Sequence, residues 1–218
     1  MYQPPHFKET RLEVLHGLMR AHPLGLLISN GEEGPVANAV PFLLDADIGP
    51  HGRLRAHLAK ANPQWRLLAD NPASPVLIVF QGADAYVTPS WYETKRETGK
   101  VVPTWNYAIV QVRGTVRVIE DGAWIAEQIT ELTASQEGRR SAPWAVTDAP
   151  AAYIQSQIKG IVGLEIAITA IDGKWKVSQN RPVADRVGVA EGLDGEASNP
   201  VAPDMAGMVR AWGGLDGN

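Results

Sequence analysis

The sequence predicts a mainly β protein with peripheral helices, folded as a small closed or half-open barrel of antiparallel strands. Six or seven apolar or alternating segments are joined by short turns rich in Gly, Asp, Asn and Pro. These segments do not alternate regularly with long helices, as they would in a doubly wound parallel sheet. Hydrophobic residues make up 44% of the 218 residues, which is enough to bury a core.

The first half of the chain begins with a helix and continues as strands. Residues 7–21 place leucines at helical spacing among charged residues, and this helix should end near His22-Pro23. Asn62-Pro63 predicts a second, short helix over 64–69, because Asn can cap free amides and Pro fits the first helical position. The strands expected in this half cover residues 24–29, 36–44, 53–58, 74–81 and 85–87.

The second half begins with a polar, aromatic connection over residues 88–104 and a long alternating strand over 105–119. Further segments are a helix over 122–136, strands over 161–171 and 174–178 joined by a hairpin turn at Asp172-Gly173, and a helix over 181–193. We expect one domain over 1–193. A loosely attached tail over 194–218 should carry a short helix near 204–212.

Composition removes several classes of protein. The formal net charge of −4 gives no bulk attraction for nucleic acid, and the absence of cysteine excludes disulfides and thiolate sites. The longest uninterrupted aliphatic stretch, 76–80, is far shorter than a membrane span, and residues 1–6 lack the pattern of a secretory signal. The five histidines show no metal-ligand spacing, and no phosphate-loop, dinucleotide or hydrolase motif is present. We therefore expect a cytoplasmic protein with no metal and no membrane contact.

A strand, a turn and a capped helix in sequence suggest an anion site. The strand over 53–58 places Arg55 and His57 on its polar face, Lys60 follows in the turn, and the free amides of the helix after Asn62 come next. Helix N-termini and cationic side chains both favour phosphate. The same residues could equally be a solvated strand face and an ordinary cap, and the spacing alone does not decide between these two interpretations.

A second cluster brackets the connection 93–104. Its aromatic and cationic members are Trp91, Tyr92, Lys95, Arg96, Lys100, Trp105 and Tyr107. They could form an aromatic lid over a planar cofactor or a substrate contact, because aromatic faces stack on flat rings and cations attract an anionic ligand. They could also form a dimer interface, where the same residue types are enriched. For nucleic acid this loop is only a weak hint.

Four motifs carry a resemblance to a known family. They are Met1-Tyr2-Gln3-Pro4-Pro5-His6-Phe7, the run from Arg55 to Trp65, Pro103-Thr104-Trp105-Asn106-Tyr107 and Ser178-Gln179-Asn180-Arg181-Pro182. Together they resemble the PaiB-type FMN-binding family over residues 1 to about 193. That family is described as FMN-binding negative transcriptional regulators. The resemblance implies the split β-barrel of pyridoxamine 5′-phosphate oxidase and flavin reductases, antiparallel and Greek-key-like, usually a homodimer with FMN at the subunit interface.

The resemblance also implies a set of FMN contacts. The strand with Asn38, Val40, Pro41 and Phe42 would run along the isoalloxazine and offer backbone hydrogen bonds to its edge. His57 and Leu58 would face the ribityl chain, and Lys60 and Asn62 would face the phosphate, beside Arg55. Gln81 would reach the flavin, while Trp105, Ser178 and Gln179 would come from the partner subunit or the barrel rim.

Three functions remain open at this point. The first is an FMN-dependent regulator or ligand sensor, and the second is an oxidoreductase of the pyridoxamine oxidase or flavin reductase kind. The third is a DNA-contacting repressor, although the sequence has no helix-turn-helix pattern. Flavin chemistry needs no nucleophile–base pair of the protein, because the cofactor carries the redox step.

Overall fold

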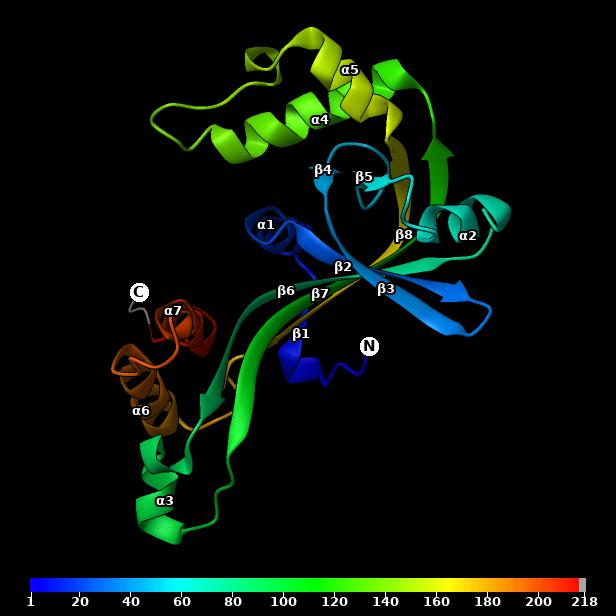
Figure 1. Ribbon diagram of the computed structural model, residues 1–218. Helices are drawn as coiled ribbons and strands as arrows, with labels where there is room; N and C mark the ends of the chain where they lie inside the picture. Colours follow the sequence, from blue (N-terminus) through cyan, green and yellow to red (C-terminus); the bar gives the residue numbers. More distant parts are fainter. Residues whose placement is uncertain (216–218) are drawn as a thin grey trace. The chain divides into compact units, whose positions relative to one another are not determined.

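The computed structural model describes residues 1–215, which form eight strands, seven α-helices and three short 3-10 helices (Figure 1). The strands are β1 Lys8–Glu9, β2 Leu24–Gly31, β3 Gly34–Pro41, β4 Leu43–Asp45, β5 Arg53–Ala59, β6 Val76–Val87, β7 Thr104–Ile119 and β8 Ile161–Lys176. The α-helices are α1 Leu12–Ala21, α2 Gln64–Asp70, α3 Glu93–Thr98, α4 Gly122–Glu137, α5 Ala151–Lys159, α6 Val183–Asp194 and α7 Ala202–Gly213. The 3-10 helices are Pro5–Phe7, Pro89–Trp91 and Val146–Asp148.

The strands form one sheet in the order β3-β2-β6-β7-β8-β5-β4, with β1 added beside β8. Antiparallel pairing joins β2 to β3 and β6, β5 to β4 and β8, and β1 to β8. This agrees with the antiparallel pairing predicted from the short turns. Because β3 stands at one end of the order, its second edge pairs with no other strand of the described chain.

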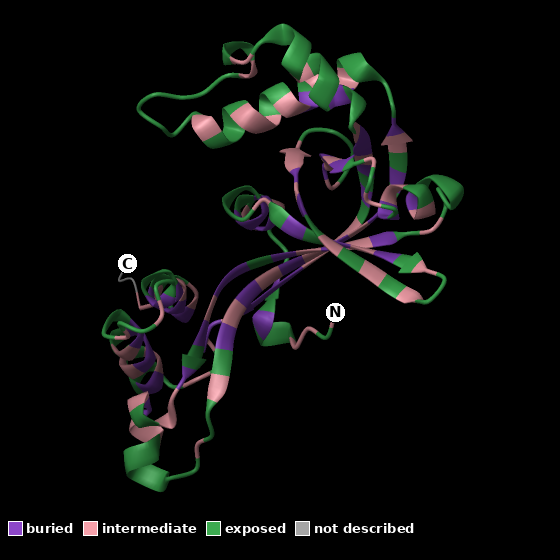
Figure 2. Ribbon diagram, in the orientation of Figure 1, coloured by how far each residue is buried: buried purple, intermediate pink, exposed green. Residues whose placement is uncertain are grey.

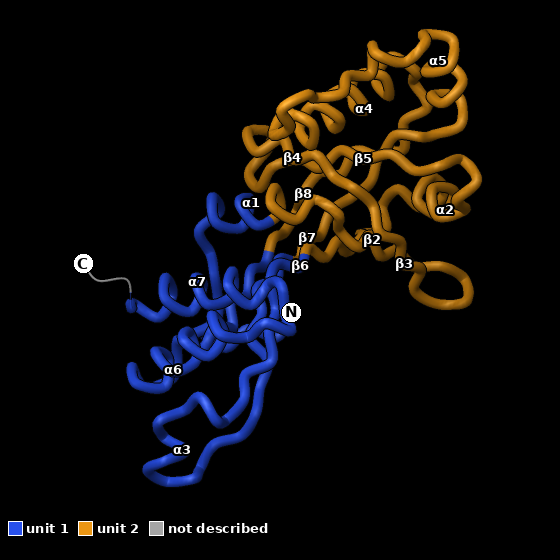
Figure 3. The backbone as a smooth tube through the Cα atoms, turned by 60° about the vertical axis from the view of Figure 1, so that its left-hand side comes forward, with its two compact units in different colours: residues 1–18, 81–110, 172–218 blue, residues 19–80, 111–171 orange. Residues whose placement is uncertain are grey.

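The chain divides into two compact units, each assembled from separate stretches of sequence (Figure 3). Unit 1 comprises residues 1–18, 81–110 and 172–218, and unit 2 comprises residues 19–80 and 111–171. Unit 1 holds β1, α3, α6 and α7, whereas unit 2 holds β2 to β5, α2, α4 and α5. The expectation of one domain over 1–193 stays a prediction.

The core of unit 2 lies between its strands and the helices beside them (Figure 2). Fully buried members of this core are Leu27, Leu54, Ile78, Phe80, Leu164 and Ile166. Helix α4 lies over β5 and β8, and its Trp124 ring rests on Gly163, where an added Cβ would lie 2.3 Å from a ring carbon. Only glycine at this position lets the ring pack directly on the backbone.

Unit 1 contains α6 and α7 packed on one another, and Figure 2 shows buried positions on both helices. Leu193 of α6 and Met205 and Val209 of α7 are fully buried. The expectation of a loosely attached tail is therefore wrong for residues 202–213, because α7 carries an apolar face that α6 covers. Residues 216–218 of the predicted tail lie outside the described residues.

The predicted hairpin at Asp172-Gly173 is also wrong, because β8 runs unbroken from Ile161 to Lys176. Gly173 pairs with Glu9 of β1, and a Cβ on it would lie 2.0 Å from the Leu15 side chain and 3.2 Å from the Glu9 carbonyl oxygen. Gly173 therefore allows Leu15 and the β1 backbone to pack closely against β8, and it does not form a turn. Two short helices, α3 and α5, were not predicted from the sequence pattern.

Other boundaries differ more modestly from the prediction. Residues 8–9 form β1, so the first helix begins at Leu12, and the strand expected over 36–44 is split into β3 and β4. Residues 76–87 form the single strand β6. None of the helices described here is long and apolar enough to cross a membrane.

Candidate functional site

The polar face of β5 carries Arg55, which the sequence places at the anion site, together with Arg53. The Arg55 Nε and Nη2 atoms donate to the two oxygens of Asp45, each at 2.8 Å, and Nη2 also donates to Glu131 of α4. Burial alone would raise the pKa of Asp45, but hydrogen bonds from Arg55 and Arg53 outweigh it and hold this pKa below its ordinary value. Hydrogen bonding to Asp45 raises the pKa of Arg55 in turn. Arg55 is thus a buried, fully compensated cation.

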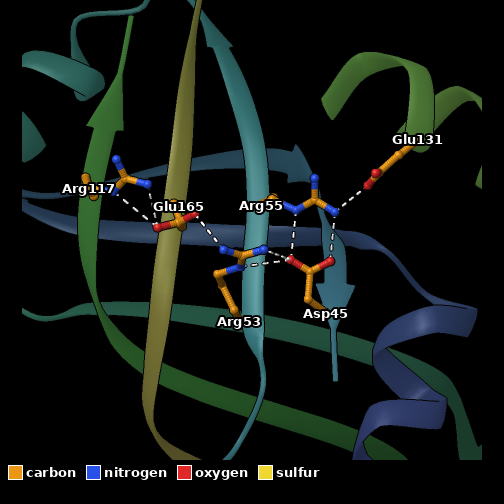
Figure 4. A network of polar contacts seen from close by, with 6 residues as sticks. All are labelled: Asp45, Arg53, Arg55, Arg117, Glu131 and Glu165. Atoms are coloured by element: carbon orange, nitrogen blue, oxygen red, sulfur yellow. Dashed lines mark hydrogen bonds and ion pairs between the residues drawn. The ribbon is translucent and has the colours of Figure 1, made fainter. Parts of the chain in front are cut away.

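The ion-pair network continues from this pair across the sheet (Figure 4). Arg53 donates to Asp45 at 2.9 Å and to Glu165 of β8 at 2.9 Å, and Glu165 accepts a further bond from Arg117 of β7 at 2.8 Å. Three carboxylates therefore meet three guanidinium groups across strands β4, β5, β7 and β8 and helix α4. The network fixes these elements together, and the role of Arg55 toward FMN stays a prediction.

His57 is the next residue on the same face of β5. Its Nδ1 lies 2.8 Å from Oε1 of Gln128, a fully buried residue of α4. The Nε2 atom of Gln128 is buried and has no hydrogen-bond partner in the described part of the chain. An unsatisfied buried amide beside a predicted cofactor contact is the kind of group that a ligand or an ordered water satisfies.

The turn after β5 carries Lys60 and Asn62. The Lys60 ammonium lies 3.6 Å from Glu120; Lys60 is partly exposed and Glu120 is exposed, so this ion pair holds the ammonium only weakly. The Asn62 side-chain oxygen accepts from the Gln64 amide at 3.0 Å, as the cap interpretation predicted, while Trp65 Nε1 donates to the Lys60 carbonyl at 2.9 Å. The turn is therefore well ordered, and Lys60 is its available cation.

Gln64, to which the sequence analysis gave no role, ties this turn to the strands. Its side chain is fully buried, and its Nε2 lies 3.1 to 3.3 Å from acceptors on β2 and β3. Its Oε1 accepts from Asn38 Nδ2 at 2.9 Å. Gln64 thus brings together Asn38 and Asn62, which were predicted for the ring and phosphate ends of FMN. The only sequence signal was a glutamine directly after the Asn-Pro helix start.

The remaining predicted residues of unit 2 are mostly core residues. Val40, Phe42 and Leu58 are buried, whereas Pro41 is partly exposed. Their side chains are therefore used in packing, and any flavin contact from residues 38–42 has to come from the free backbone edge of β3. This is consistent with the predicted backbone hydrogen bonds to the ring.

A pocket of about 280 Å³ is also present in unit 2, between α1, the strands and the end of α4. Phe42, Leu54 and Phe80 are among its lining residues, and the rings of Phe42 and Phe80 meet edge to face with centroids 5.6 Å apart. Arg20 and Arg139 also line it. Of the predicted site residues it contains only Phe42.

In unit 1, three predicted residues line one surface hollow of about 240 Å³. Gln81 of β6 and Trp105 and Tyr107 of β7 form it together with Asp84 and Ile109. Trp105 is 54% exposed, and its ring meets Tyr86 edge to face at 6.0 Å. Exposed aromatic rings around a shallow hollow can receive either a flat ring or a partner protein.

The other aromatic residues of the connection lie elsewhere in unit 1. Trp91 packs against Gly188 and Gly192 of α6, where a Cβ would lie 2.1 to 2.3 Å from its atoms, and Tyr92 is buried under Arg181. Lys95 donates to Ser90 at 3.1 Å, and Arg96 pairs with Glu93 at 2.9 Å. Trp91 and Tyr92 therefore help to fix α6 in place.

The segment after β8 is held by its own polar side chains. Ser178 is hydrogen-bonded to Asn106 at 2.9 Å, and the Gln179 amide bonds the backbone of Trp175 and Val177. Their predicted contacts with FMN stay predictions. Residues 1–215 hold no cluster of three or more His, Asp or Glu side chains placed to bind a metal ion.

Comparison with known proteins identifies the family. Residues 1–170 match the family described as "Putative FMN-binding domain". The chain is 36% identical to an uncharacterized protein of Emericella nidulans, over 98% of each chain, and 32% identical to protease synthase and sporulation protein PAI 2 of Bacillus subtilis, over 96% of each.

A solved structure, the FAD and heme binding protein from Mycobacterium smegmatis, superimposes with a TM-score of 0.57 at 20% identity, over 78% of this chain and 73% of that one. The structure is mixed α/β with one large antiparallel sheet, and the predicted split-barrel fold is confirmed, although helices take a larger share of the chain than a mainly β fold implies. The chain belongs to the PaiB-type family of FMN-binding split-barrel proteins.

Proposed function

We propose that the protein binds FMN and acts as a flavin-dependent regulator or ligand sensor. The observation that carries the proposal is the family match over residues 1–170, which spans the strand–turn–helix segment with Lys60 and Asn62. The structural relative that binds FAD supports a flavin on this fold. The name of the Bacillus relative links that protein to sporulation, which supports a regulatory role.

The residues present fit FMN. The free backbone edge of β3 can meet the polar edge of the isoalloxazine, and the weakly paired Lys60 supplies the positive charge that a phosphate needs. His57 lies between these two groups in the sequence, next to the unsatisfied Gln128 amide. Bound FMN would supply electron transfer, while the protein would bind and orient it.

Removing the Lys60 ammonium should weaken FMN far more than riboflavin, which lacks the phosphate. A charge-assisted hydrogen bond contributes about 1.5–3 kcal/mol, so we expect Lys60→Ala to weaken FMN by about 10- to 100-fold. The measurement is titration of flavin fluorescence with the full chain.

Arg140→Ala, at an exposed arginine of the same unit that pairs with Glu137, is the control and should leave FMN affinity unchanged. Equal effects of Lys60→Ala on FMN and riboflavin would refute the placement of the phosphate at Lys60. No saturable FMN binding by the wild-type chain would refute the proposed function.

We further propose a homodimer with FMN at the subunit interface. In this arrangement unit 2 of one copy supplies β3, His57 and Lys60, and the hollow around Trp105 in the partner covers the ring. Trp105 is a large exposed aromatic residue, the type most often dominant in protein interfaces.

Trp105→Ala should therefore weaken the dimer by about 30-fold, the effect of losing about 2 kcal/mol at an interface residue. Analytical ultracentrifugation measures the dimer constant. Tyr153→Ala, at another exposed aromatic residue, should have no effect. A wild-type chain that stays monomeric with saturating FMN would contradict the interface.

A measurement of enzyme activity distinguishes the regulator from the oxidoreductase. NADH or NADPH oxidation that needs FMN and turns over repeatedly would favour the oxidoreductase over the sensor. The DNA-contacting repressor would have to bind promoter DNA selectively in a gel shift at physiological salt. Binding that disappears as the salt concentration rises would instead be non-specific attraction to the phosphate backbone.

A further inference from the structure

A second polar pocket lies wholly within unit 1, between the start of β7, the end of β8 and the turn that leads to α6. Its volume is about 160 Å³, room for several water molecules or for a small ligand. The lining residues that matter are Tyr92, Thr104, Asn106, Lys176 and Arg181.

The positive charge in this pocket has no negative partner within the described part of the chain. Lys176 is half-buried, and its ammonium donates to the Thr104 hydroxyl at 2.5 Å and to the Trp105 carbonyl, both neutral acceptors. Burial lowers the pKa of Lys176, and the nearby charges of Lys174 and Arg181 lower it further. Within residues 1–215 no carboxylate forms an ion pair with Lys176 or Arg181, whereas Arg53 and Arg55 are both compensated.

The Tyr92 hydroxyl is a second unsatisfied group in the wall. The side chain is 1% exposed, and its hydroxyl makes no hydrogen bond of good geometry in the described structure. Burial raises the pKa of this hydroxyl, and the nearby Arg181 guanidinium opposes that rise. The Arg181 guanidinium lies 4.5 Å from the centre of the Tyr92 ring, which orients both groups. The nearby carboxylate of Asp185 accepts hydrogen bonds from the Thr94 amide and hydroxyl, each at 2.9 Å, and forms no ion pair with Arg181 in the described structure.

The turn that carries Arg181 is fixed in an unfavourable backbone conformation. Ser178 has a φ of 66°, which is rare for a residue other than glycine, and its side chain is hydrogen-bonded to the buried Asn106. The Arg181 amide donates to the Ser178 carbonyl at 2.9 Å. The guanidinium is therefore presented by a rigid turn, which lowers the entropy lost on binding a ligand.

We propose that this pocket binds a phosphate group, either inorganic phosphate or the phosphomonoester end of a small molecule. Lys176 and Arg181 supply the charge, the guanidinium offers two parallel donors, and the Tyr92 hydroxyl donates a further bond. Two uncompensated cations with Lys174 close by match a dianion better than a singly charged carboxylate. The inference does not depend on FMN binding, because phosphate alone tests it.

The experiment is isothermal titration calorimetry of the chain of 218 residues, freed of flavin, with inorganic phosphate and, at equal ionic strength, with acetate. We expect saturable phosphate binding that Lys176→Met weakens about tenfold or more and Tyr92→Phe weakens a few-fold. Lys100→Met, at an exposed lysine of the same unit outside the pocket, should bind phosphate like the wild type. Circular dichroism and thermal unfolding establish that each variant is folded.

A second series uses FMN and riboflavin as competitors. Displacement of phosphate by FMN and not by riboflavin would identify the flavin phosphate as the ligand and would contradict its placement at Lys60. No displacement by either flavin would indicate a separate phosphate ligand. Both outcomes support a phosphate pocket. Absence of saturable phosphate binding, equal binding of acetate, or equal losses in Lys176→Met and Lys100→Met would overturn it.

Discussion

The arginines of this protein differ in how their charge is compensated. The Arg55 side chain is only 10% exposed and contacts two carboxylates, Asp45 and Glu131. Its charge therefore stabilises the packing of β4, β5 and α4. Arg181 meets an aromatic ring and no carboxylate within the described residues. The same residue type therefore stabilises the fold at one position and is available to an anion at the other.

Glu9 is the residue whose ionisation should matter most for stability. It is 7% exposed and accepts hydrogen bonds from Arg11 and, at 3.0 Å, from Trp212 of α7. The Arg11 side chain chiefly lowers the pKa of Glu9 from 4.5 to about 2, against the opposing effect of burial.

Because the folded pKa lies below the unfolded one, Glu9 stabilises the fold above pH 4.5, and this stabilisation is lost as the pH falls toward 2. The full stabilisation by ionised Glu9 is about 3 kcal/mol in the free energy of unfolding. Glu9→Gln should therefore be less stable than the wild type at pH 7 and should lose less stability between pH 5 and 2. Urea unfolding across this range measures both. Equal pH slopes for the two proteins would contradict the assignment.

At the scale of elements, the close approach of α4 to the sheet depends on Gly163. This residue pairs with His57 in the β5–β8 ladder, so the Trp124 ring lies beside His57 on the same face of the sheet. Helix α4 also supplies Gln128 to His57 and Glu131 to Arg55. The position of the helix therefore sets the position of both polar groups.

Gly163→Ala should force Trp124 and α4 outward, at a cost of about 1–3 kcal/mol for overpacking. The free energy of unfolding in urea measures this loss, and FMN titration should show weaker binding because the partner of His57 moves. Gly17→Ala is the control: its Cβ meets nothing within 4 Å, and alanine favours the α1 helix. Unchanged stability of Gly163→Ala would show that the ring yields freely.

At the scale of the whole molecule, the chain enters each unit more than once. Residues 1–18, 81–110 and 172–218 form unit 1, and β6, β7, β8 and α1 each contribute residues to both units. Neither unit is a continuous stretch of sequence, so neither can be cut out as one fragment.

We therefore expect the two units to unfold together. Scanning calorimetry should show one transition whose calorimetric and van't Hoff enthalpies agree, because melting either unit breaks strands that belong to both. The transition should be the same when followed by tryptophan fluorescence and by circular dichroism. Two separated transitions would show that the units are thermodynamically independent.

Sequence patterns predicted most of the elements because each carried a local signal. The alternation of Leu54, Ala56 and Leu58 identified β5, and Asn62-Pro63 located the start of α2. Gly173 misled the prediction, because a glycine after Asp is typical of a hairpin turn, and its reason here is contact with the distant Leu15. No local pattern contains that information.

The candidate site was predictable only in part, for the same reason. The motif from Arg55 to Trp65 pointed to Lys60 and Asn62, whose turn forms as expected. The partners of those residues come from far along the chain: Gln128 and Glu131 are more than 70 positions from His57 and Arg55. Which carboxylate compensates which arginine is settled by packing, so the sequence alone could not separate Arg55 from Lys60.

The sequence by itself determined the family, the antiparallel β character and the turn that presents Lys60, because these depend on local propensities and contiguous motifs. The tertiary structure decided which cations are neutralised and which polar groups are left unsatisfied in the described chain. It placed Arg55 between two carboxylates and left Lys176 and Arg181 without a carboxylate partner. It also buried the Tyr92 hydroxyl without a hydrogen bond of good geometry. The physical reason is that compensation of charge and burial of a hydroxyl are properties of neighbours in space, which only the folded chain brings together.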